Sequence, residues 1–120
     1  MVEVREEMAE DDVTEVVNET QNHRLVLARD GHEGELIYER RGNQLILVHT
    51  EVPKELAGKG VGALLVEAAV MWAERDGLVI VPWCPYAWRW LQEHEAVASK
   101  VQIDWDAPSE SVPGDPGMRR

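Results

Sequence analysis

The feature that most restricts the fold of this chain is an apolar, β-branched run that leads through a glycine-rich loop into a helix-forming segment. The run covers residues 45–52, and the loop carries Gly58, Gly60 and Gly62. Glycine allows positive φ and lets the backbone approach a ligand closely. A helix that begins at such a loop points unpaired N–H groups and a partial positive charge into it. The pattern therefore predicts a strand, a loop and a helix N-terminus that together bind a phosphate group.

The helix is expected from about Gly60 to Asp76, because apolar residues recur there on one helical face. That face consists of Val61, Leu64, Leu65, Ala68, Ala69, Trp72 and Ala73. Gly77 suits the position just after the last turn. Residues 78–81 are a short apolar run, typical of a buried strand. Strand, helix and strand form a β-α-β unit, which we expect to be right-handed.

The residues before this unit predict an antiparallel meander. Strands are expected over 24–29, 34–41 and 44–52, with a shorter one over 13–18. Asp30-Gly31 and Gly42-Asn43 supply the tight turns between them. The two-residue period of a regular strand puts four β-branched residues on one face of the last strand, namely Ile46, Val48, Thr50 and Val52.

The second half of the chain predicts less structure. Pro85 suits the first turn of a second helix that runs to about Glu93 or beyond, and residues 101–105 are a last strand or part of an irregular segment. The folded domain is thus expected over 13–105, in an α/β (α+β) class. Residues 1–12 are acidic without periodicity and 106–120 are rich in Pro and Gly, so both are predicted to be flexible tails.

Composition excludes several classes of protein. Twelve basic residues against 23 acidic ones give a net charge of −11, which argues against a nucleic-acid partner and suits a cationic one. No apolar run is long enough to span a bilayer. The single cysteine, Cys84, rules out an internal disulfide. We expect a cytoplasmic protein that is a monomer or weak homodimer, with no membrane partner.

Two common phosphate loops do not fit the glycine segment. A P-loop needs Ser or Thr after its Lys to hold a magnesium ion, and here Lys59 is followed by Gly60. A dinucleotide loop needs an acidic residue about twenty positions further on to hold a ribose. Residues 81–84 are Val-Pro-Trp-Cys and contain none. A third candidate ligand, coenzyme A, also carries a pyrophosphate.

The chain resembles the GCN5-related N-acetyltransferase (GNAT) superfamily. The acetyl-CoA loop of that family has the form Gln/Arg-x-x-Gly-x-Gly/Ala between a strand and a helix, and residues 57–62 (Ala-Gly-Lys-Gly-Val-Gly) lie in that register. Residues 49–56 and 81–86 (Val-Pro-Trp-Cys-Pro-Tyr) are similar to a small, minimal branch of uncharacterised predicted acetyltransferases. The resemblance covers roughly residues 17–95.

The resemblance implies a minimal GNAT-like fold that binds acetyl-CoA and transfers its acetyl group to a primary amine. It places the thioester beside the end of the strand and the pyrophosphate at the loop. The residues implied in binding are Thr50, Val52, Ala57, Gly58, Lys59, Gly60, Val61, Gly62, Ala63, Pro85 and Tyr86. Two family positions differ: Ala57 replaces the Gln/Arg, and Leu91 stands where a general-acid Tyr is usual.

Three residues are candidates for catalysis. His49 has the intrinsic pKa of a base near neutral pH, although a strand histidine packed beside Leu45 and Leu47 is an alternative. Glu51 shares the face of His49 in a regular strand and would relay a proton through water, or be a plain surface carboxylate. The resemblance also implies that a bulge is frequent at this place, and a bulge would break the alternation. Cys84 precedes Pro85 at a helix N-terminus, which favours thiolate. It would accept the acetyl group or shape the thioester pocket, unless it is simply a small buried residue.

Other residues have weaker roles. Tyr86 would donate a proton in place of the missing Tyr, or pack at the rim. Trp72 is predicted to be core, whereas Trp83, Trp88 and Trp90 would wall an acceptor pocket near the last helix. The histidines lie apart without ligand spacing, so no metal is expected. Besides an acetyltransferase, two functions remain open: a non-catalytic CoA-binding module, and an acidic interaction or scaffold protein.

Overall fold

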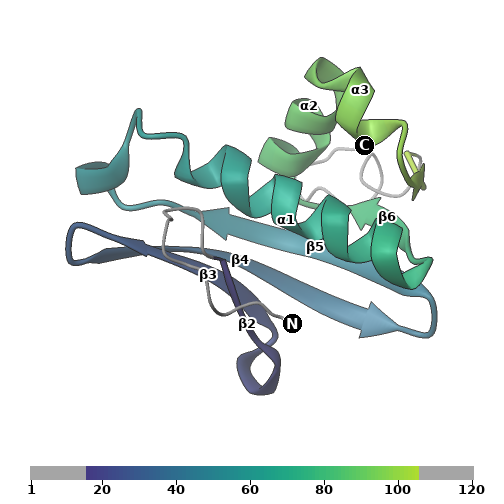
Figure 1. The fold of residues 1–120 in the computed structure, drawn as a ribbon, viewed down its shortest axis with the longest axis horizontal. Helices are drawn as coiled ribbons and strands as arrows, with labels where there is room; N and C mark the ends of the chain where they lie inside the picture. Colours follow the sequence, from purple (N-terminus) through teal and green to yellow (C-terminus); the bar gives the residue numbers. More distant parts are fainter. Residues whose placement is uncertain (1–15, 106–120) are drawn as a thin grey trace, which may run out of the picture.

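The computed structural model describes residues 16–105. In this part of the chain a six-stranded sheet has the order β2-β3-β4-β5-β6-β7. Helices α1, α2 and α3 lie on one side of it (Figure 1). The mixed α/β architecture expected for a minimal GNAT-like fold is therefore confirmed. The expected tails over 1–12 and 106–120, and residues 13–15 of the first expected strand, lie outside the described residues.

The first four strands form the expected antiparallel meander. They are β2 (Val17–Glu19), β3 (Arg24–Arg29), β4 (His32–Arg41) and β5 (Gln44–Glu51), with a 3₁₀ turn η2 (Thr20–Asn22) after β2. β4 begins two residues earlier than expected, at His32, which pairs with Arg29. Both residues between them have positive φ, 55° at Asp30 and 80° at Gly31. This is the two-residue turn that matches the twist of a hairpin.

A β-α-β unit follows the meander. The 3₁₀ turn η3 (Lys54–Leu56) leads into α1 (Val61–Asp76), and β6 (Val79–Pro82) pairs with β5 in parallel. The chain then forms α2 (Pro85–Glu93), α3 (Glu95–Ala98) and β7 (Gln102–Ile103), which is parallel to β6. The second helix and the last strand are thus both present, although the strand is shorter than its candidate segment.

The buried face of α1 differs from the expected one. Leu64, Ala68 and Trp72 are only partly buried, whereas Val66 and Val70 are fully enclosed. α1 contacts α2 and α3 as well as the sheet, so its buried stripe extends beyond the single face that a helix on a sheet alone would need. Trp72 is partly buried and packs against the core rather than within it. It lies at the β4 edge of α1, where its ring meets that of Tyr38 edge to face.

A bulge in β5 also overturns the expected face of that strand. Leu47 pairs with Tyr38, but Ile37 pairs with His49, so one residue of β5 is left over. The extra residue reverses the alternation of side chains. Ile46 consequently lies on the face away from the helices, whereas Thr50 pairs with the buried Leu36 on the helix face. The four β-branched residues do not share a face.

The N-terminus of α1 lies unusually close to the sheet. A Cβ added to Gly34 on β4 would be 2.6 Å from Cγ1 of Val61 and 3.6 Å from Cδ1 of Leu65. Any side chain at Gly34 would thus displace the first turn of α1. The lack of a side chain at this point of β4 allows α1 to begin where it does, beside the glycine loop.

Replacement of Gly34 by Ala should therefore destabilise the domain by about 1–3 kcal/mol, because Val is stiff at χ1 and cannot turn its methyl group away. Val61→Ala removes that methyl group. The two substitutions combined should cost about 1 kcal/mol less than the sum of their separate effects. Urea unfolding of the two single variants and the double variant measures this coupling, and strictly additive effects would contradict the close approach.

Candidate functional site

The glycine loop joins η3 to α1 through two glycines in the left-handed region. Gly58 has φ 79° and Gly60, the N-cap of α1, has φ 76°. A Cβ at either position would meet nothing within 4 Å. Positive φ, and not a lack of space, therefore explains why both residues are glycines. The space beside them is open.

The first turn of α1 has backbone donors without acceptors. The first helical bond runs from the N–H of Leu64 to the carbonyl of Gly60, at 3.0 Å. Within residues 16–105, no backbone acceptor pairs with the N–H groups of residues 60–63, and no side chain caps the helix at Gly60. This uncapped end is the arrangement that an anion completes.

Lys59 differs from its neighbours in the loop. Its backbone N–H donates to the carbonyl of Leu56 at 3.2 Å, so it is not available to a ligand. Its side chain reaches the β3–β4 turn, where Nζ lies 3.0 Å from Oδ2 of Asp30. This pairing could not be predicted from the sequence, because Lys59 and Asp30 are 29 positions apart and no local pattern connects them.

Gly62 has a role unlike that of the other two loop glycines. It is buried inside α1, and a Cβ there would be 3.0 Å from the hydroxyl oxygen of Tyr86 and 3.1 Å from Cε2 and Cζ. The ring of Tyr86 therefore packs on the first turn of α1. The alternating glycine pattern predicts a single function for all three residues, whereas only Gly58 and Gly60 have the positive φ of a loop.

β5 and β6 separate beside this turn. Their parallel pairing ends at Leu47 and Pro82, and the N–H of Cys84 still bonds to the carbonyl of Leu47 at 2.8 Å. Pro82 has no N–H with which to continue the ladder. Beyond it, Oγ1 of Thr50 and Sγ of Cys84 lie 3.3 Å apart and share a hydrogen bond. The thiol of Cys84 is enclosed, with the residue only 2% exposed.

His49 and Glu51 lie on the opposite face from Thr50. The bulge turns His49 to the face of Ile37, so it does not pack beside Leu45 and Leu47. Its Nε2 lies 2.8 Å from Oε1 of Glu51, and the two side chains are 55% and 64% exposed. The pair is thus open to solvent at the end of β5.

Tyr86 lies between the loop and Cys84 in this arrangement. The residue is 43% exposed, and burial raises the pKa of its hydroxyl, with smaller contributions in the same direction from Cys84 and Glu93. It is therefore a protonated donor at neutral pH. Of the other predicted binding residues, Val52 packs partly against the core, whereas Ala57 and Pro85 are exposed at the end of η3 and the start of α2.

Residues 24–101 match a family described as GCN5-related N-acetyl-transferase. The chain belongs to this family. A search of curated proteins found no match to it. No helix of this GNAT domain, within residues 16–105, combines the length and the apolar character needed to cross a membrane.

The three tryptophans expected to wall one pocket lie in separate contacts of the GNAT domain. The guanidinium of Arg41 lies over the ring of Trp83, 5.9 Å from the ring centre. Trp88 meets Trp105 edge to face at 6.0 Å, and Trp90 stacks on His94 at 3.9 Å. Trp83 follows the end of β6, whereas Trp88 and Trp90 lie on α2, and each ring has a different partner.

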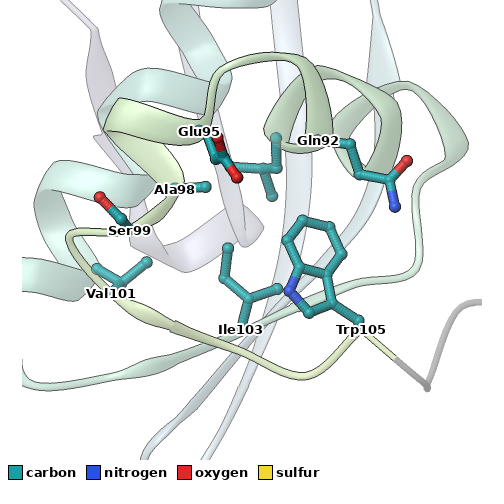
Figure 2. A pocket seen from close by; sticks show the side chains of 8 residues that line it. Gln92, Glu95, Ala98, Ser99, Val101, Ile103 and Trp105 are labelled. Carbon is teal, nitrogen blue, oxygen red and sulfur yellow. The ribbon is translucent and has the colours of Figure 1, made fainter.

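One hollow among the described residues lies away from the glycine loop. It is a groove of about 570 Å³ between α2, α3 and the segment that follows them. Figure 2 shows Gln92 and Glu95 on its helical side, with Ile103 and Trp105 facing them. Sequence reasoning missed this groove because its lining comes from three short elements.

The contact between Gly62 and Tyr86 is testable through stability. Gly→Ala in a helix normally stabilises by about 0.5–1 kcal/mol. Because a methyl group at position 62 would meet the Tyr86 ring, G62A should not give this gain in the native chain. In a Y86A background, where the ring is gone, the same change should stabilise the domain. Urea unfolding measures both effects, and equal effects in the two backgrounds would contradict the contact.

Proposed function

We propose that this GNAT domain binds acetyl-CoA at the N-terminus of α1 and transfers the acetyl group to a primary amine. Membership of the family supports an acetyltransferase-type enzyme in general. The observation that carries the proposal is the uncapped first turn of α1, with donors at residues 60–63 and no acceptor for them in the described chain. A pyrophosphate supplies acceptor oxygens and negative charge, which suit both the donors and the helix dipole.

The residues at the end of β5 and the start of α2 would serve the reactive end of the ligand. When bound, acetyl-CoA supplies an activated acyl group on a thioester. Thr50 and Cys84 close the gap between β5 and β6, so they would border that group. Tyr86, which is protonated at neutral pH, would give a proton from its hydroxyl to the departing sulfur.

The exposed pair of His49 and Glu51 would prepare the acceptor. An amine attacks only in its neutral form, and the imidazole of His49 is suited to take up the proton that the amine loses. Glu51 accepts a hydrogen bond from the imidazole at 2.8 Å and would stabilise its charged form. Glu51 is therefore a positioning residue in this scheme, and His49 the base.

For Cys84, burial favours the pocket role over the acceptor role. A thiol that is 2% exposed and hydrogen-bonded to Thr50 has no free path to an incoming acyl group. Recovery of an acetylated Cys84 by mass spectrometry, after incubation with acetyl-CoA and no amine, would favour the covalent route. Full activity of both C84S and C84A would exclude it.

Binding to the helix end gives the first functional prediction. Gly60→Asp puts a carboxylate beside the donors, where it would repel a pyrophosphate, and should weaken acetyl-CoA binding by about tenfold or more. Gly60→Asn is the matched control, since Asn has the same shape and also tolerates positive φ. Isothermal titration should show a much smaller loss for Asn. Equal affinities for the two variants would place the phosphates elsewhere.

The second functional prediction concerns catalytic activity. Tyr86→Phe keeps the ring that packs on Gly62 but removes the proton, and should lower kcat by about a hundredfold. Tyr38→Phe, in a tyrosine that bonds to Asn18 away from the site, is the control and should retain full activity. Time-dependent CoA release with a panel of amines measures both.

The same measurements separate the alternative functions. A raised melting temperature with acetyl-CoA, but no CoA release with any amine, would favour a non-catalytic CoA-binding module. No thermal shift at all would favour an acidic interaction or scaffold protein. The amine acceptor, the cytoplasmic location, the monomer or weak homodimer, and the lack of nucleic-acid and membrane partners remain predictions from the sequence.

A further inference from the structure

We infer that Asp30, at the tip of the β3–β4 hairpin, holds the ammonium group of Lys59 and thereby competes with a phosphate of the ligand for it. The inference rests on the proposed binding of acetyl-CoA at the glycine loop. It adds a residue, from a distant part of the chain, that sets the affinity of that site.

The hairpin tip reaches the loop for a structural reason. β4 passes beneath the first turn of α1, because Gly34 has no side chain to hold Val61 away. The tight turn after Arg29 then projects Asp30 beside the loop, where its carboxylate meets Lys59 at 3.0 Å. The pair thus joins two segments that the fold brings together.

Lys59 can contribute to phosphate binding only through its side chain. Its backbone N–H already donates to Leu56, unlike the N–H groups of residues 60–63. Its Nζ is the cation nearest along the chain to those donors, because it lies directly before the N-cap Gly60. A phosphate at the helix end and the carboxylate of Asp30 therefore attract the same ammonium group.

The effect of Asp30 on the affinity for the ligand has a predictable sign. An exposed ion pair is worth little in water, so Lys59 can leave Asp30 at small cost. Asp30 nevertheless lowers affinity, since it occupies the ammonium group and adds negative charge near an anionic ligand. Removal of its charge should tighten binding, and removal of the Lys59 charge should weaken it.

Isothermal titration of CoA at low ionic strength tests the inference. D30N keeps a residue that tolerates positive φ in the turn, and should bind CoA about two- to fivefold more tightly than the native chain. K59M should bind about five- to tenfold more weakly. In the K59M background, D30N should give a smaller gain than in the native chain, because only the removal of its negative charge still acts and no ammonium group remains to be released.

E39Q is the matched control, since it removes one carboxylate from an exposed pair, Glu39 with Arg41 at 2.9 Å, on the far part of β4. Its affinity should stay near that of the native chain. Unchanged or weaker binding by D30N would overturn the inference, as would an equal gain in both backgrounds. Native protein that does not bind CoA would instead refute the proposed function.

Repetition of the titrations with dephospho-CoA identifies the phosphate that Lys59 contacts. If K59M weakens the binding of CoA alone, Lys59 contacts the 3′-phosphate. If K59M weakens the binding of both ligands, Lys59 contacts the pyrophosphate.

Discussion

The first turn of α1 is packed from two sides at positions that carry no side chain. Gly34 on β4 lies beneath this turn, and the ring of Tyr86 packs against Gly62 within it. Three elements far apart in the chain therefore meet around one turn. Their contact positions the first-turn N–H groups of residues 60–63 next to the start of α2, and the hairpin tip next to the loop. Binding and chemistry in the proposed site both depend on this close packing.

The second constraint is the separation of β5 from β6. A parallel ladder needs donors from both strands, and Pro82 cannot supply one. On the other side, the bulge opposite Ile37 and Tyr38 reverses the faces of the last residues of β5. Together they leave Thr50 and Cys84 to bridge the gap on one face, with His49 and Glu51 on the other. The proposed acid and base thus approach the gap from different sides.

Local patterns predicted the elements well because each depended on neighbouring residues. Hydrophobic periods, turn pairs and prolines located the strands, α1 and α2 to within a few residues. Predictions that depended on packing were less accurate. The predicted buried face of α1 left out Val66 and Val70, which are enclosed because α2 and α3 also cover the helix. The face of His49 depended on whether β5 carries a bulge, and because a bulge involves two strands, β5 by itself does not locate one.

The sequence by itself determined the β-α-β unit, the glycine loop, its likeness to an acetyl-CoA loop and the membership of the GNAT family that follows. These are properties of contiguous residues, so short-range geometry is enough to specify them. Only the tertiary structure decided the separate roles of Gly58, Gly60 and Gly62, the contact of Thr50 with Cys84, and the pairing of Lys59 with Asp30. Each of these depends on how closely two distant segments approach, which packing across the whole sheet determines.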